Sequence, residues 1–364
     1  MNKRFVIAGG GTGGHIFPAI AIANELRRQL PGCEVLFVGA RGKMEMEKVP
    51  QAGYQIEGLD ISGFNRSSLI KNLSLPFKLV KSFLQVRTIL KKFRPDAVVG
   101  VGGYSTYPVL RMAQRKGIPT FIHEANSFAG KSNQMLGKKA ARIFTGTDGM
   151  ERFFDAGKIV VTGNPVRTTI SRSVKNREEA IRSFSLDPLK KTVLVVGGSL
   201  GAKSINEAIA AGLEQMAAAD LQLIWQTGKP FAGAGQQAAG GYKQVWVNDF
   251  ITNMESAYAA ADIIVSRAGA MAIAEICLVA KPAILVPYPY AAEDHQTSNA
   301  MNLVQKQAAI MVKDEDAKSK LVDQILQLAV NEEQQKQLQK NIIPLGITNA
   351  DELVVNEILK CIGR

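Results

Sequence analysis

The sequence predicts an α/β protein with two doubly wound parallel sheets. Two stretches begin alike, because apolar runs at residues 4–8 and 192–196 are each followed by a glycine-rich loop and a helical stretch. Most other apolar runs also alternate with helical stretches, and β-rich runs that alternate with helices are typical of parallel sheets covered on both faces. The chain of 364 residues allows roughly two domains of about 150 residues or more.

The further predicted strands end in small or polar residues. They cover residues 35–39, 97–103, 120–123, 159–163, 263–266 and 283–287. Ligands of doubly wound sheets bind beyond the carboxyl ends of the strands, so we expect the binding residues there. The crevices of the two sheets would then face each other across one cleft. We expect residues 228–241, rich in glycine, to form a flexible surface loop.

A domain boundary is predicted near residues 163–167. Asn164-Pro165 breaks local structure, and the charge balance changes at the same place. Of the 44 Lys and Arg, 24 lie at or before Pro165, with 11 of the 32 Asp and Glu, which leaves 20 against 21 in the remainder. The predicted domains are 1–163 and 164–345. The whole positive excess lies in the first, which indicates an anionic partner for it.

Basic residues concentrate in a predicted amphipathic helix over residues 68–94, interrupted near Pro76. Two interpretations stay open. The helix could pack on its own sheet with a solvated lysine face. It could instead contact an anionic membrane surface. Aromatic residues are not interleaved with a basic stripe, so we expect no nucleic-acid partner. The candidate membrane contacts are Leu73, Leu75, Phe77, Leu79, Lys78 and Lys81.

Cysteine usage and hydropathy predict a cytoplasmic protein. Cys33, Cys277 and Cys361 lie far apart and fit neither a zinc site nor a disulfide framework. The first apolar run is too short for a secretory signal, and no later run is long enough to span a membrane.

The first glycine loop matches a dinucleotide-binding pattern at Gly9, Gly11 and Gly14. The acidic residue that an NAD site requires is missing, since the second strand leads to Arg41, on which an NADP site would depend entirely. Nicotinamide chemistry is therefore disfavoured. The general property remains, because glycine permits close backbone approach and the amides of a helix N-terminus hold phosphate.

The second glycine loop also matches G-x-S-x-G around Ser199, with Asp294 and His295 as conceivable triad partners. An acid immediately before its histidine cannot readily orient that ring, and a hydrolase would leave the first loop unexplained. We interpret Ser199 as a hydroxyl donor to phosphate.

Each of the three histidines lies in a motif loop. His15 follows backbone amides that could hold a diphosphate, so it is the candidate general base. A structural role fits His123 and His295 at least as well. Residues 314–316 resemble a metal-binding D-x-D, but they precede a helix, where capping is the simpler account. We predict no metal site.

Several motifs follow one another in the order that a single enzyme family has them. They cover residues 10–19, 102–104, 123–126, 163–167, 197–202, 267–270 with Glu275, and 294–296 with 299–300. In this order they resemble the family of UDP-N-acetylglucosamine transferases that convert lipid I into lipid II in bacterial wall synthesis.

The resemblance implies a GT-B glycosyltransferase with two Rossmann-like domains, inversion at the sugar C1, and no cofactor or metal. A C-terminal helix at about 346–364 would return to the first domain. The acceptor would be lipid I, and the enzyme would be peripheral on the cytoplasmic face of the membrane, with wall-synthesis proteins as further partners.

The resemblance also implies the roles of individual residues. Glu275 would bind the ribose, Ser199 and Arg167 the diphosphate, and Gln296 the sugar. His15 is the preferred base and Glu124 the lesser candidate. Residues that would hold the nucleotide are Ile251, Ala270, Met271, Ala272, Ile273 and Ala274. Residues that would line the facing wall are Thr12, Gly13, Gly14 and Asn126.

Three other functions stay open. One is a UDP-N-acetylglucosamine 2-epimerase, which would need no lipid contact and would have acidic groups at the sugar, and another is a glycolipid galactosyltransferase. A membrane-bound module that binds a nucleotide sugar without turnover would not need His15 as a base.

Overall fold

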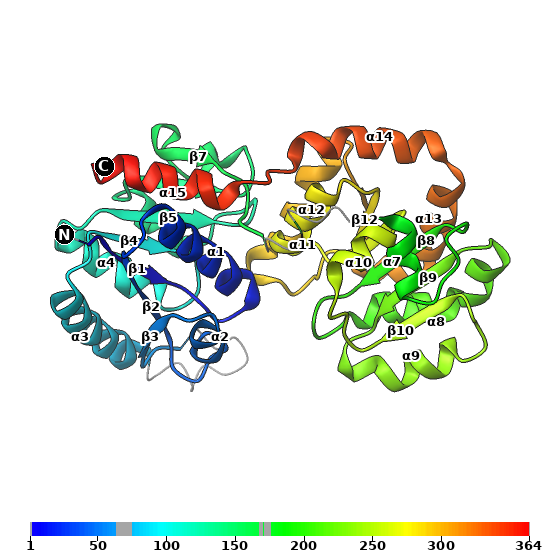
Figure 1. Cartoon of the computed structure of the whole chain (residues 1–364), viewed down its shortest axis with the longest axis horizontal. Helices are drawn as coiled ribbons and strands as arrows, with labels where there is room; N and C mark the ends of the chain where they lie inside the picture. The colour runs from blue at the N-terminus through cyan, green and yellow to red at the C-terminus, as the bar shows by residue number, and fades with distance from the viewer. Residues whose placement is uncertain (1, 63–74, 167–169, 171–175, 364) are drawn as a thin grey trace. The chain divides into compact units, whose positions relative to one another are not determined.

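The computed structural model describes residues 2–62, 75–166, 170 and 176–363, without the side chains of residues 75 and 76. The chain divides into two compact units (Figure 1). The first unit comprises Met1–Arg167 with Asn349–Arg364, and the second comprises Thr168–Thr348.

Within the described residues of the first unit, seven strands form one parallel sheet in the order β3-β2-β1-β4-β5-β6-β7. The order reverses beside β1, since β2 lies on one side of it and β4 on the other, and ligands of such sheets bind at this switch point. The strands are β1 (Arg4–Ala8), β2 (Glu34–Ala40), β3 (Gln55–Leu59), β4 (Ala97–Gly100), β5 (Thr120–Glu124), β6 (Arg142–Thr145) and β7 (Ile159–Val161).

Helices cover both faces of this sheet because successive side chains of a strand point to opposite faces. In β1, Phe5 and Ile7 pack into one core with α1 and α15, while Val6 and Ala8 pack into the other with α3, α4 and α5. Figure 1 shows α15 beside α1, which it contacts. The helices are α1 (Gly13–Gln29), α2 (Glu45–Gln51), α3 (Leu75–Phe93), α4 (Thr106–Arg115), α5 (Lys131–Gly137), η2 (Met150–Arg152), η3 (Ala156–Lys158) and α15 (Ala350–Cys361).

The described part of the second unit holds a six-stranded parallel sheet in the order β10-β9-β8-β11-β12-β13. Its strands are β8 (Thr192–Val196), β9 (Gln222–Gln226), β10 (Val245–Asn248), β11 (Ile263–Ser266), β12 (Ala283–Leu285) and β13 (Ile310–Met311). Leu194 of β8 faces one core cluster, and Val193 and Val195 face the other.

The helices of the second unit are α7 (Arg177–Ser183), α8 (Lys203–Ala218), η4 (Lys229–Phe231), α9 (Ala232–Ala239), α10 (Met254–Ala260), α11 (Ala270–Val279), η5 (Ala292–Asp294), α12 (His295–Gln305), η6 (Asp314–Asp316), α13 (Ala317–Val330), α14 (Glu332–Ile342) and η7 (Ile343–Leu345). The predicted flexible loop at 228–241 is wrong, because η4 and α9 lie there. A methyl group on Gly235 would come within 2.7 Å of Thr227 Cγ2, so this glycine permits close packing.

The two predicted parallel sheets are confirmed, and the structure adds β3, β6, β9, β10 and β13, of which β9 is a fully buried apolar strand that the sequence analysis missed. In β3, more and less exposed residues alternate and Gly58 lies near its end, and β6 spans only four residues. In α3, Val86 and Leu90 are buried in the sheet's core, so the C-terminal part of this helix packs on its own sheet. None of the described helices is long and apolar enough to cross a membrane.

Candidate functional site

The first glycine loop joins β1 to α1 at the switch point of the first sheet. Gly10 and Gly11 have φ angles of +147° and +87°, which a residue with a side chain rarely adopts. Gly10 N donates to Gly102 O at 3.1 Å, and a methyl group on Gly103 would overlap the Gly10 backbone. The loops after β1 and β4 therefore touch through glycine.

The predicted wall residues of this loop lie at the start of α1. Thr12 is the N-cap in an extended conformation, and Gly13 and Gly14 form the first helical positions. Amides in the first turn of a helix lack partners within the helix and carry the positive end of its dipole. The loop can therefore hold an anionic group.

His15 lies in the first turn of α1, and its ring is oriented by the loop before it. Its Nδ1 lies 3.0 Å from Gly10 O. A carbonyl oxygen can only accept, so Nδ1 carries the proton and Nε2 is the basic nitrogen. A methyl group on Gly102 would come within 2.7 Å of Nε2, so this glycine makes room for the imidazole.

The two polar residues that end β5, His123 and Glu124, are both buried. His123 is 1% exposed, and burial lowers the pKa of its imidazole to about 4, with the nearby His15 adding to the decrease and the Gly163 backbone opposing it. The His123 ring is therefore neutral near pH 7. Glu124 accepts hydrogen bonds from Asn126 N at 3.1 Å, Gly130 N at 3.2 Å and Asn133 Nδ2 at 2.8 Å. These bonds hold Asn126 and the start of α5.

The second glycine loop joins β8 to α8 in the same way. Gly201 has a φ of +76°, and a methyl group on it would overlap the backbone of Thr227. Ser199 is exposed in this loop. His295 Nδ1 donates to Ala292 O at 2.5 Å, and Asp294 accepts from Thr297 Oγ1 at 2.7 Å. These bonds are not those of a hydrolase triad.

A buried amide, which sequence reasoning missed, braces this loop. Gln226, the last residue of β9, is 3% exposed. Its Nε2 donates to Gly198 O at 2.9 Å, and its Oε1 accepts from Ile251 N at 2.8 Å. One side chain therefore joins the glycine loop to the predicted nucleotide contact Ile251.

The other residues predicted to contact the nucleotide sugar follow neighbouring strands of the second sheet. Residues 270–274 open α11 after β11, and Gln296 lies in the first turn of α12 after β12. Because the carboxyl ends of parallel strands lie at one edge of a sheet, these residues share that edge with Ser199. Gln296 Oε1 accepts from Tyr288 N at 3.0 Å.

Glu275 is oriented by a tyrosine that the sequence did not indicate. Its Oε2 accepts a hydrogen bond of 2.9 Å from the hydroxyl of Tyr258. Tyr258 is 5% exposed in α10, on the element before β11. The predicted ribose ligand thus has at least one neighbour that restricts its rotamers.

The predicted capping role of residues 314–316 is wrong. Neither η6 nor α13 has a hydrogen bond from the side chain of its N-cap residue. Asp314 instead pairs with Arg267 at 2.5 Å and accepts from Ser204. Within the described ranges, no group of three or more His, Cys, Asp or Glu side chains could hold a metal ion.

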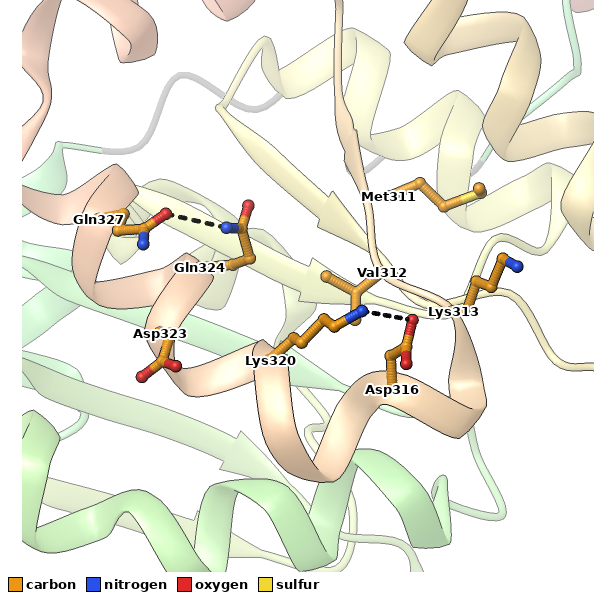
Figure 2. A pocket seen from close by; sticks show the side chains of 8 residues that line it. All are labelled: Met311, Val312, Lys313, Asp316, Lys320, Asp323, Gln324 and Gln327. Atoms are coloured by element: carbon orange, nitrogen blue, oxygen red, sulfur yellow. Dashed lines mark hydrogen bonds and ion pairs between the residues drawn. The ribbon is translucent and has the colours of Figure 1, made fainter.

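A separate groove of about 450 Å³ lies along α13 (Figure 2). Lys320 pairs with Asp316 at 3.1 Å, and Gln324 donates to Gln327 at 2.9 Å. None of its lining residues is a predicted site residue. We therefore assign it no part in the site.

Some predicted contacts fall where the structure describes nothing. Arg167 and Leu73 lie outside the described residues, as does the side chain of Leu75. On α3, Phe77 is 80% exposed and Leu79 is 36% exposed. Lys81 pairs with Asp60 at 2.8 Å, and Lys78 donates to Ser62 Oγ at 3.2 Å.

Comparisons with known proteins agree over almost the whole chain. Residues 5–145 match the glycosyltransferase family 28 N-terminal domain, and residues 192–354 match the glycosyltransferase family 28 C-terminal domain. A relative from Phocaeicola vulgatus is 53% identical over 99% of this chain and 96% of its own length. One from Parabacteroides distasonis is 48% identical over 100% of both chains. Both relatives are named UDP-N-acetylglucosamine–N-acetylmuramyl-(pentapeptide) pyrophosphoryl-undecaprenol N-acetylglucosamine transferase.

Solved structures show the same fold. A crystal structure of Acinetobacter baumannii MurG has a TM-score of 0.80 and 29% identity, covering 98% of this chain and 99% of that one. A UDP-N-acetylglucosamine 2-epimerase is similar at a TM-score of 0.67, but its 15% identity shows the fold alone; the match covers 99% of this chain and 96% of that one.

Proposed function

The chain belongs to glycosyltransferase family 28 and is a UDP-N-acetylglucosamine-dependent transferase of the GT-B fold, and we propose how its two sheet edges divide the reaction. The reaction moves N-acetylglucosamine from UDP-N-acetylglucosamine to undecaprenyl-pyrophosphoryl-N-acetylmuramyl-pentapeptide, which converts lipid I into lipid II. The observation that carries this function is identity of 45–53% over nearly the full chain to relatives named for that transfer.

The donor belongs at the edge of the second sheet. Glu275 accepts the two ribose hydroxyls, since one carboxylate can accept two donors. The amides of residues 270–274 and the Ile251 backbone hold the nucleotide. Ser199 and Arg167 meet the diphosphate, and Gln296 contacts the sugar. Arg167 is permanently charged and suits the negative charge that develops on the departing UDP.

The acceptor belongs at the edge of the first sheet, beside Thr12, Gly13, Gly14 and Asn126. Its C4 hydroxyl attacks C1 of the donor sugar from the face opposite UDP. The bond from C1 to the acceptor oxygen forms as the bond from C1 to the phosphate oxygen breaks, and the configuration inverts. His15 Nε2 takes the hydroxyl proton, which agrees with the hydrogen bond from Nδ1 to Gly10 O.

A polyprenyl-linked acceptor stays in the bilayer, so the first unit must reach a membrane surface. On α3, Phe77, Val80 and Leu84 are 80%, 62% and 59% exposed. Their spacing of three and four residues places them on one side of the helix. The net charge of +13 up to Pro165 adds attraction to anionic lipid. The enzyme is thus peripheral on the cytoplasmic face of the membrane.

The test is sugar transfer with labelled UDP-N-acetylglucosamine, with and without lipid I. Label should enter the lipid fraction only when lipid I is present. His15→Ala should lower kcat by about 10²- to 10⁴-fold, the usual contribution of a general base, while UDP affinity stays the same. Label that stays out of the lipid would contradict the transfer. Unchanged kcat in His15→Ala would remove His15 as the base.

A further inference from the structure

We propose that Glu45 is a positioning residue that holds the peptide between Gly10 and Gly11, and through it the imidazole of His15. This inference rests on the proposed role of His15 as the base. Glu45 is the first residue of α2, after β2, and it is 1% exposed. Strand β2 lies beside β1 in the sheet, so the start of α2 comes next to the first glycine loop.

The Glu45 carboxylate accepts two backbone hydrogen bonds. Oε2 accepts from Gly11 N at 2.8 Å, and Oε1 accepts from Ala40 N at 2.9 Å. No cation in the described part of the chain pairs with it, so these amides replace the water that a buried carboxylate loses. A methyl group on Gly10 or Gly39 would overlap Glu45. The carboxylate therefore lies directly against the loop.

Glu45 and His15 bind the two ends of one peptide group. Gly11 N–H, which donates to Glu45, and Gly10 C=O, which accepts from His15 Nδ1, belong to the same peptide. A peptide group is planar, so fixing its N–H fixes the direction of its C=O. The carboxylate thus determines where the acceptor for Nδ1–H lies.

This peptide needs such a contact because glycine stands on both sides of it. Without side chains, Gly10 and Gly11 resist rotation of the peptide less than other residues would. Gly102 O holds the other side of Gly10 through Gly10 N at 3.1 Å, but it does not bind the rotating peptide. Loss of the Glu45 carboxylate would therefore let Gly10 C=O turn away from His15.

Glu45→Gln is the informative substitution. Its amide keeps the size of the side chain but presents one NH₂ group to Gly11 N–H or Ala40 N–H, which places two donors against each other. We expect kcat to fall by about 10- to 100-fold, because small misplacement of a catalytic group costs up to about 10². KM for UDP-N-acetylglucosamine should stay the same. Glu45→Asp keeps the charge and should recover part of the loss.

Glu25→Gln is the matched control. Glu25 is also a buried carboxylate of the first unit, 5% exposed, but it pairs with Arg28 at 2.6 Å near the far end of α1. Its substitution should change the melting temperature and leave kcat unchanged. If Glu45 only stabilises the fold, Glu45→Gln would behave like this control.

A readout independent of turnover is the tautomer of His15. The chain has three histidines, so imidazole ¹⁵N signals of labelled protein can be assigned by single substitutions. At about pH 8, the His15 imidazole should carry its single proton on Nδ1. Glu45→Gln should shift His15 toward a mixture of the Nδ1–H and Nε2–H tautomers. An unchanged tautomer in Glu45→Gln overturns the proposal. Full kcat in His15→Ala would instead overturn the assignment of His15 as the base. The tautomer measurement does not depend on that assignment, so the two failures can be told apart.

Discussion

Removing the Tyr258 hydroxyl should weaken the binding of UDP, because it removes one of the contacts that orient Glu275 before the ligand arrives. In the structure this hydroxyl donates to Glu275 Oε2 at 2.9 Å, and Tyr258 is 5% exposed. Tyr258→Phe deletes the donor and keeps the ring. The carboxylate then samples more rotamers, and nucleotide binding has to order it again.

The size of the effect follows from that ordering. Immobilising one rotamer-rich side chain costs about 0.5–1.5 kcal/mol, which corresponds to about a 2- to 12-fold higher Kd for UDP. The free energy of unfolding should also fall, by about 1–3 kcal/mol, because the lost hydrogen bond goes to a carboxylate. Glu275 does not contact the reacting atoms in our assignment, so kcat should change little.

Calorimetric titration with UDP measures the affinity without turnover. The control is Tyr54→Phe, because Tyr54 is 4% exposed and its hydroxyl donates to Asn24 Oδ1 at 2.7 Å in the first unit. That variant should lose stability and bind UDP like the unsubstituted protein. If Tyr258→Phe binds UDP at full strength while Glu275→Gln does not, the orienting role is wrong. Full affinity in both would refute the ribose assignment.

Two further predictions concern the first unit. Burial lowers the pKa of His123 from 6.5 to about 4, so the unfolded chain binds a proton at this histidine at a higher pH than the folded chain does. The free energy of unfolding should therefore be highest above about pH 6.5 and should decrease by about 3 kcal/mol as the pH falls to 4. Denaturant titrations of His123→Gln should show a shallower decrease over this range, and an equal slope would contradict the assignment. Phe77→Ser and Leu84→Ser should each weaken binding to anionic vesicles by about tenfold, from about 1.5 kcal/mol of lost apolar burial. Leu189→Ser, at a side chain that is 95% exposed in the second unit, should not; unaltered binding in the α3 variants would remove this surface as the contact.

Local sequence pattern was enough to predict much of the fold. Apolar runs such as 4–8 and 192–196 form strands, and the glycine loops after them lead into α1 and α8. These features depend on residues close together in the chain, so a single sequence displays them. The motif order also indicated the family, which the comparisons show. The edge strands β3 and β13 were missed because neither has a continuous apolar run of strand length, whereas β9 has a buried Leu-Ile-Trp run and was missed without such a reason.

The sequence alone predicted that His15 and Ser199 follow strands in glycine-rich loops suited to phosphate, and the order of its motifs implied a nucleotide-binding role for Glu275. Tertiary structure decided which distant residues hold these loops and their neighbours. Glu45 reaches Gly11, Gln226 joins Gly198 to Ile251, and Asp314 pairs with Arg267. Each of these partners lies on a different element from its residue. Their meeting depends on the order of strands in the sheet, because that order, not distance along the chain, selects which loops become neighbours.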